Sequence, residues 1–154
     1  MIKIICIGKI KEKYIKEAIN DYLKRLSKYT KIEIIELNNY CSDNINDILF
    51  HEKELILKNI KEKEYIITLE IEGKQINSYE FSKKIEETLN YNSNISFIIG
   101  GSYGLHDEIK TISNFHMSIS KMTFPHQLFR VILLEQIYRA YKIQNNEAYH
   151  KWYA

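Results

Sequence analysis

The chain has 154 residues, 45% of them apolar and 27% charged, with only five glycines and one proline. This length and composition predict one folded domain over residues 1–154 and exclude a chain dominated by disordered linkers. No stretch has the length of a membrane span and no signal peptide is visible, so we expect a cytoplasmic protein with no membrane partner. Cys6 and Cys41 form no zinc-binding spacing, and no metal site is predicted.

Basic residues are concentrated at the two ends of the chain. Residues 1–30 carry eight basic and three acidic side chains, residues 31–120 carry nine and fifteen, and residues 121–154 carry five and two. A polyanion such as nucleic acid would therefore be met by the two ends rather than by the middle. The alternative explanation of this pattern is a charged helix face that is simply solvated.

Short apolar runs alternate with segments of helical periodicity along the whole chain. We expect strands at residues 2–7, 31–37, 65–69, 95–99 and 115–119. We expect helices at residues 12–29, 45–60, 78–89, 105–113 and 125–143. Gly73 is expected to form a turn after the third strand, and Ser78 to cap the third helix.

This alternation predicts an α/β fold, with a mostly parallel sheet covered by helices on both faces. Ligands of such sheets bind beyond the carboxyl ends of the strands. Three predicted strands end in informative residues, which are Leu69-Glu70, Gly100-Gly101 and Ser120-Lys121. If these three ends lie side by side, they frame one pocket.

A glycine loop, Gly100-Gly101-Ser102-Tyr103-Gly104, follows the fourth predicted strand. Glycine permits a sharp turn and a close approach of a ligand to the backbone. The loop matches neither the dinucleotide fingerprint nor a P-loop, so it is either a structural turn or a ligand loop. The segment from Ser120 to Phe124, after the fifth strand, could likewise present backbone groups to an adenine edge or be a plain connection.

The last predicted helix is apolar on most sides, from Leu128 through Val131-Ile132-Leu133-Leu134 to Tyr141. A helix of this kind is buried on most sides. It predicts either an isologous homodimer interface or a central core helix. On the same helix, Arg139 can pair with Glu135 one turn back, whereas Arg130 has no such partner and is expected to contact phosphate.

The carboxyl-terminal tail from Asn145 to Tyr153 is dense in aromatic and basic side chains. Aromatic rings can stack on an unpaired base and lysine can contact phosphate, which favours RNA as the partner of this tail. The alternative is a tail that docks on its own domain or frays.

These residues together resemble one family, the bacterial SPOUT-class methyltransferases that modify ring nitrogen 3 of a pseudouridine in large-subunit (23S) ribosomal RNA. The resemblance covers nearly the whole chain. It is carried by Ile7-Gly8-Lys9, by Thr68-Leu69-Glu70 with Gly73-Lys74, by the segment from Ile99 to Leu105, and above all by Ser120 to Leu128, Arg130 to Tyr138 and Ala148 to Lys151.

The resemblance implies a carboxyl-terminal trefoil knot, a homodimer, and S-adenosylmethionine as cofactor with no metal. It places the cofactor contacts at Leu69, Gly100, Ile119, Ser120, Lys121, Met122, Thr123 and Phe124. It also implies 23S ribosomal RNA in the assembled ribosome as the substrate. From residue type and position, His150 is the candidate for handling the imide proton, Tyr149 for stacking or orientation, and Arg130 for the RNA backbone or a developing charge.

One departure concerns RNA binding, because this chain has Asn145-Asn146 where the family often has an Arg-Gly pair. Two other functions stay open. One is an assembly factor that binds S-adenosylmethionine and docks on ribosomes without catalysis. The other is a transfer-RNA methyltransferase of the same class.

Overall fold

The computed structural model of the protein describes residues 1–151. Strands and helices alternate along the chain. In order they are β1 (Ile2–Ile7), α1 (Lys13–Leu26), β2 (Ile32–Leu37), α2 (Ile45–Lys58), β3 (Tyr65–Gln75), α3 (Ser78–Tyr91), β4 (Ile95–Ile99), α4 (Asp107–Ile112), β5 (Phe115–Ser118) and α5 (His126–Gln144). No helix within residues 1–151 is long and apolar enough to cross a membrane.

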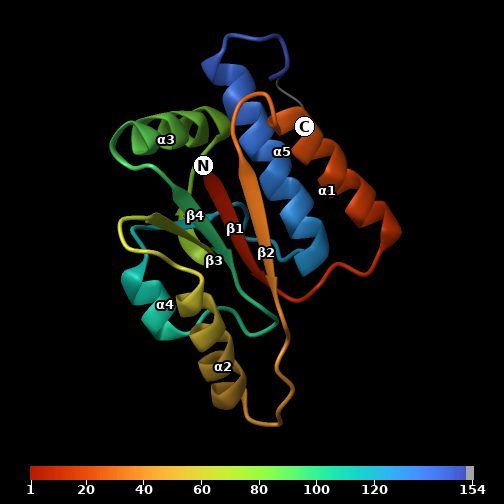
Figure 1. Ribbon diagram of the computed structural model, residues 1–154, viewed down its shortest axis with the longest axis vertical. Coiled ribbons are helices and arrows are strands. Elements are labelled where there is room, and N and C mark those ends of the chain that lie inside the picture. The colour runs from red at the N-terminus through yellow and green to blue at the C-terminus, as the bar shows by residue number, and fades with distance from the viewer. Residues whose placement is uncertain (152–154) are drawn as a thin grey trace.

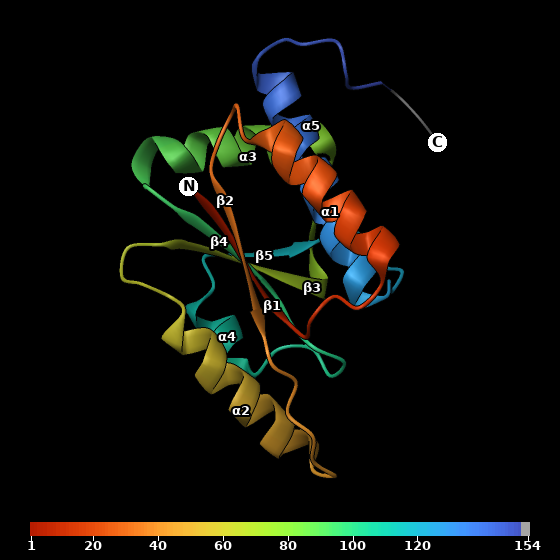
Figure 2. The same ribbon diagram turned by 45° about the vertical axis from the view of Figure 1, so that its right-hand side comes forward.

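The five strands form one sheet in the order β2-β1-β4-β3-β5, and every neighbouring pair is parallel. Helices α1, α3 and α5 cover one face of this sheet and helices α2 and α4 cover the other (Figure 2). The predicted α/β fold with helices on both faces is therefore confirmed. Strands β1 and β4 are neighbours in the sheet although β2 and β3 lie between them in sequence. The chain therefore changes direction across the sheet beside β4, which is the kind of position where such sheets bind ligands.

Two apolar clusters fill the space between the sheet and its two helical layers. Alternate residues of β1 belong to different clusters, because side chains of a strand point to opposite faces. Ile4 packs in the cluster beneath α1, α3 and α5, and Ile5 packs in the cluster beneath α2 and α4. All residues of β1 and β4 are buried, as expected for central strands covered on both sides.

Strand β3 runs six residues beyond its predicted end, to Gln75, but Leu69 and Lys74 both pair with Met117, so residues 70–73 between them bulge out of the ladder. Its pairing with β5 shifts register between Leu69 and Lys74 and then resumes. A Cβ at Gly73 would lie 2.7 Å from the carbonyl carbon of Met117. Glycine is therefore needed at the end of this bulge, because the backbones of β3 and β5 approach closely there.

The cap of α3 is also one residue earlier than predicted. Asn77 accepts a hydrogen bond from the Glu80 backbone N–H, and the Glu80 carboxylate accepts one from the Asn77 N–H. This reciprocal capping box satisfies two donors at the helix start. Ser78, the expected cap, is instead the first helical residue, and its hydroxyl donates to Gln136 Oε1 at 2.7 Å.

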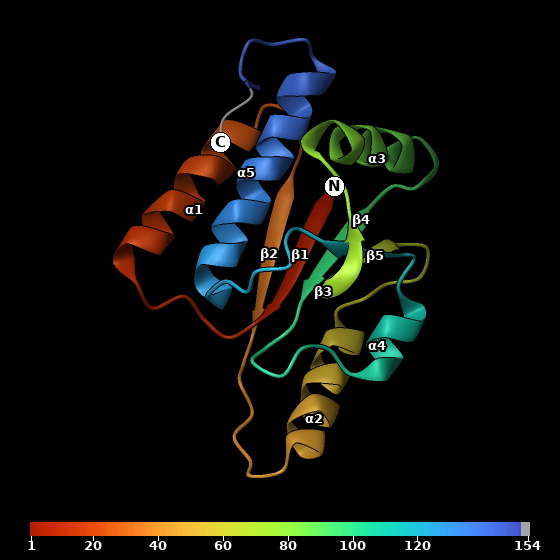
Figure 3. The same cartoon turned by 180° about the vertical axis from the view of Figure 1, so that it is seen from behind.

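Helix α5 lies between α1 and α3 in views from both sides of the molecule (Figures 1 and 3). Leu133, Leu134 and Ile137 are fully buried there. Within one chain, the broad apolar surface of this helix is thus explained by the core-helix alternative. The expected ion pair between Arg139 and Glu135, one turn apart on this helix, is confirmed, because Arg139 Nη2 lies 2.5 Å from Glu135 Oε1.

Candidate functional site

A cavity of about 330 Å³ lies against residues 69–72 of β3 and at the carboxyl ends of β4 and β5. These strands are neighbours in the sheet, so the segments that follow them converge. Seven of the eight positions that the resemblance assigns to the cofactor line this cavity, namely Leu69, Gly100, Ile119, Ser120, Met122, Thr123 and Phe124. The eighth, Lys121, is exposed and does not line it. Sequence reasoning therefore brought together residues that are far apart in the chain but adjacent in space.

The glycine loop forms one wall of the cavity in a tight turn. The Gly104 N–H donates to the Gly101 carbonyl at 3.1 Å, and Gly104 has a φ of +80°, which favours glycine. A Cβ at Gly100 would lie 2.5 Å from the Gly104 carbonyl oxygen. Two of the three glycines are thus required by the shape of the turn itself.

The segment between β5 and α5 forms the facing wall. The Ser118 hydroxyl donates to the Ser120 carbonyl at 3.0 Å, and the Ser120 hydroxyl accepts from the Met122 N–H at 3.0 Å. Pro125 then provides the cap position from which α5 begins. These local bonds hold the segment in a turned conformation whose backbone borders the cavity.

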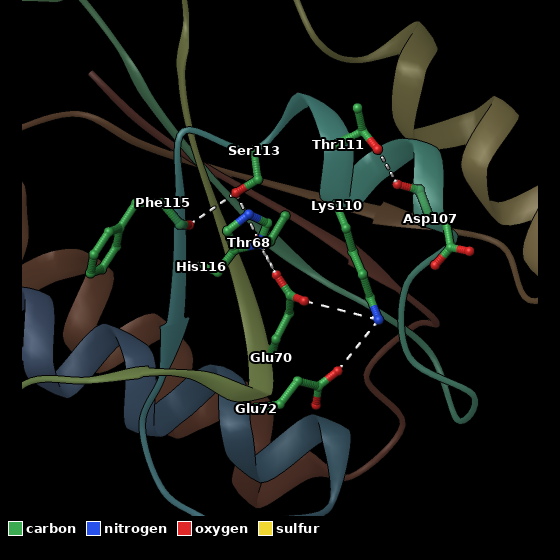
Figure 4. A network of polar contacts seen from close by, with 9 residues as sticks. All are labelled: Thr68, Glu70, Glu72, Asp107, Lys110, Thr111, Ser113, Phe115 and His116. Carbon is green, nitrogen blue, oxygen red and sulfur yellow. Dashed lines mark hydrogen bonds and ion pairs between the residues drawn. The ribbon is translucent and has the colours of Figure 1, made fainter.

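Charged groups occupy one edge of this otherwise largely apolar cavity. Glu70 and Glu72 on β3 and Lys110 on α4 line it, and their side chains point toward one another (Figure 4). Lys110 Nζ lies 3.4 Å from Glu72 Oε1 and 4.0 Å from Glu70 Oε1. The Thr68 hydroxyl donates to Glu70 Oε2 at 2.6 Å, and His116 Nδ1 contacts the same oxygen.

The sequence pattern indicated Glu70 only as part of a strand end and gave no reason to single out His116. It did not find Lys110 at all. No spacing in the chain pairs α4 with the end of β3, so these partners become visible only when the sheet is assembled.

Arg130, the candidate for contact with the RNA backbone or a developing charge, is buried within the chain. Its side chain is only 1% exposed. Nη2 donates to the carbonyls of Ile7 and Gly8 at 2.8 and 2.7 Å, and Nη1 donates to Glu36 Oε2 at 2.9 Å. A guanidinium enclosed in this way ties α5 to the end of β1 and is shielded from solvent.

The tail after α5 folds back onto the helix layer, as the docked alternative proposed. Glu147 accepts hydrogen bonds from the Tyr29 hydroxyl and from Lys142 Nζ, both at 2.6 Å. The Tyr149 ring packs edge-on against Tyr138 with centroids 4.9 Å apart. Burial, and then the charge of Glu135, raise the pKa of Tyr149 to about 12. Residues 152 and 153, which completed the predicted aromatic tail, lie outside the described residues.

His150 does not line the first cavity. Its Nδ1 lies 3.0 Å from Arg139 Nη1, and its ring packs edge-on against Tyr79 with centroids 4.7 Å apart. Both His150 and Arg139 line a second cavity of about 400 Å³ between α3, α5 and the tail. The two cavities share a wall formed by Met117, Ser118 and Ile119.

A parallel sheet with a ligand-sized cavity beside its point of strand reversal defines an α/β protein of the ligand-binding kind. A family model described as predicted SPOUT methyltransferase matches residues 1–150. The chain belongs to the SPOUT methyltransferase family.

Two relatives are each 52% identical to this chain over 97% of its length and 99% of theirs. They are a putative ribosomal RNA large subunit methyltransferase H from Methanococcus maripaludis and a ribosomal RNA large subunit methyltransferase H from Clostridium botulinum. Among solved structures, a probable methylase family protein from Haemophilus influenzae matches with a TM-score of 0.57 and 13% identity, covering 99% of this chain and 71% of that one. This last likeness concerns the fold alone.

Proposed function

We propose that the protein is a cytoplasmic methyltransferase that modifies ring nitrogen 3 of a pseudouridine in 23S ribosomal RNA, in the assembled ribosome. The observation that carries the proposal is the convergence of seven expected cofactor positions around one cavity. The names of relatives that are 52% identical over nearly the whole chain support ribosomal RNA of the large subunit as the substrate. The proposal includes the carboxyl-terminal trefoil knot that the sequence resemblance implies.

The first cavity fits S-adenosylmethionine as its ligand. Its volume lies within the range of roughly 300–1,000 Å³ that is typical of small-molecule sites. Apolar side chains such as Leu69, Leu105 and Phe124 suit an adenine ring, and the backbone after β4 and β5 offers donors and acceptors to its edge. When bound, the cofactor supplies an electrophilic methyl group on a positively charged sulfur.

Replacing Gly100 by alanine should weaken S-adenosylmethionine binding about tenfold or more. The new Cβ would meet the Gly104 carbonyl at 2.5 Å, so the glycine loop would have to open and its wall of the cavity would move. Isothermal titration calorimetry measures the affinity, and circular dichroism checks that the variant is folded. An unchanged affinity would mean that this loop does not shape the cofactor site.

The chain's own residues must then hold the base and accept its imide proton. We assign the role of proton acceptor to His150, because the second cavity, which it lines, adjoins the first cavity through Met117, Ser118 and Ile119. S-adenosylmethionine held in the first cavity would supply the methyl group, and His150 would take the proton that the ring nitrogen gives up. Arg139 replaces Arg130 as the guanidinium placed beside this reaction, since it lines the same cavity as His150 and lies 3.0 Å from its Nδ1.

The basic ends of the chain lie next to each other in the fold, which supports a shared RNA surface. Helix α1 packs beside α5, whose end carries the tail (Figure 1). Six lysines on α1 or close to either of its ends are exposed, namely Lys9, Lys11, Lys13, Lys16, Lys24 and Lys28. Phosphate contacts by such lysines make binding to ribosomes weaken as the salt concentration rises.

We also propose a homodimer that uses the start of α5. Met122 and Leu128 are 75% and 40% exposed, which leaves apolar surface uncovered beside the cofactor cavity. A symmetric dimer through this surface would bring two cofactor cavities and two basic tails together.

If the dimer uses this surface, Leu128→Glu should raise the dissociation constant of the dimer about tenfold or more. A carboxylate buried without a partner in an apolar interface is strongly unfavourable. Analytical ultracentrifugation measures the change. The matched control is Ile112→Glu on α4, where the side chain is 38% exposed on the other face of the sheet. A monomeric wild-type protein, or equal effects of both substitutions, would contradict this interface.

Labelled S-adenosylmethionine incubated with intact ribosomes, free large subunits and transfer RNA separates the candidate functions. Ribosomes from cells lacking the corresponding enzyme provide unmodified substrate. The proposal predicts label in large-subunit RNA of intact ribosomes. Label in transfer RNA alone would favour the transfer-RNA enzyme, and cofactor binding without any label would favour a ribosome assembly factor.

A further inference from the structure

The charged edge of the first cavity is formed by Glu70, Glu72 and Lys110 and is built into the fold. The Glu70 side chain is only 7% exposed, and Thr68 and His116 hold its Oε2 in place. An ionised carboxylate only accepts hydrogen bonds, so His116 Nδ1 is the donor in this contact. Glu70 is thereby fixed at the border of the cavity and cannot turn away from it.

The charges that line the cavity do not cancel. Glu70 and Glu72 contribute two negative charges at neutral pH, and Lys110 contributes one positive charge. The remaining titratable residue of the lining is His126. Burial, and then the charge of Arg130, lower its pKa, so its ring is neutral. The described lining therefore carries a net charge of one negative unit.

The methyl donor and the product of its reaction differ in one charge. S-adenosylmethionine has a positively charged sulfonium, and S-adenosylhomocysteine has a neutral thioether. The adenosine and amino-acid ends are the same in both. We propose that the cluster of Glu70, Glu72 and Lys110 selects the sulfonium donor over the neutral product, which favours product release after transfer.

This inference rests on the proposed function and adds a specificity device to it. The attraction between a cation and a net negative wall is strongest where the wall excludes water, and Glu70 meets this condition. Glu72 is largely exposed, so solvent screens its charge and its contribution is smaller. Lys110 opposes both carboxylates and limits the preference.

The ratio of the dissociation constants of the product and the donor reports the selection directly. General losses of affinity, including damage to the adenosine or amino-acid contacts, change both constants and cancel in this ratio. Isothermal titration calorimetry of both compounds with each variant gives the ratio without any catalytic turnover.

We expect Glu70→Gln to lower the preference for the donor roughly tenfold, and Glu72→Gln to lower it about twofold. Lys110→Gln should raise the preference, because it leaves both carboxylates uncompensated. The matched control is Glu86→Gln, which makes the same charge change at an exposed position on α3. Its ratio should equal that of the wild type.

Opposite shifts in the Glu70 and Lys110 variants would support the inference. Equal ratios in the wild type, Glu70→Gln and Lys110→Gln would overturn it. If Glu70→Gln does not fold, the sign of the Lys110→Gln shift decides the question, because Lys110 is one-third exposed and tolerates replacement. A wild-type protein that binds neither compound would instead overturn the proposed function.

Discussion

Replacing Arg130 by methionine is expected to lower the free energy of unfolding by about 3 kcal/mol. The substitution keeps the buried stem but removes the donors to the carbonyls of Ile7 and Gly8 and to Glu36. Glu36 can turn to water, whereas the two enclosed carbonyls lose their partners. Urea unfolding at a fixed protein concentration measures the loss.

Arg25→Met is the matched control for this experiment. Arg25 is an exposed arginine on α1 whose pairing with Asp21 is a surface ion pair, worth about 0–1 kcal/mol. Its stability should therefore remain close to that of the wild type. A stable Arg130→Met variant that had lost only ribosome binding would restore the RNA-contact role that the sequence suggested.

His150→Ala is expected to reduce the single-turnover rate of methyl transfer on ribosomes by about 10²-fold or more. In the proposed mechanism, removal of the imidazole deprives the imide of its proton acceptor. S-adenosylmethionine affinity should stay the same, because His150 lines the second cavity and not the first. Rapid-quench measurement at saturating cofactor separates the two quantities.

His51→Ala provides the comparison for a histidine that has no place in the proposed site. His51 lies on α2, on the opposite face of the sheet from α5, and its ring stacks on that of Tyr40 with centroids 3.8 Å apart. This variant should transfer the methyl group at the wild-type rate. Full single-turnover rate in His150→Ala would show that another group or water removes the proton.

The fold was largely predictable because burial and periodicity are local properties of the sequence. All five strands and five helices occur close to their expected positions. The errors arose where a distant segment decides the local structure. Gly73 continues a strand because the backbone of Met117 lies against it, and no pattern within β3 indicates that neighbour.

The convergence of the candidate cofactor positions on one cavity could be predicted from the sequence, whereas the charged partners in and around the site could not. Leu69 ends the predicted third strand, Gly100 and Ser120 follow the next two, and the rule that ligands bind at strand ends brings them together. Arg130 has no acidic residue one turn away on its own helix, and its actual partner, Glu36, lies 94 residues away in sequence. Long-range ion pairs of this kind leave no trace in helical spacing.

Mass-spectrometric mapping of the methylated nucleoside tests the central claim most directly. Ribosomes lacking the modification are incubated with the protein and S-adenosylmethionine carrying a labelled methyl group, and the RNA is then digested and fragmented. We predict one labelled nucleoside, a pseudouridine methylated at ring nitrogen 3 in large-subunit RNA. Label on any other atom or RNA, or no label in ribosomes with cofactor-saturated protein, would contradict the account.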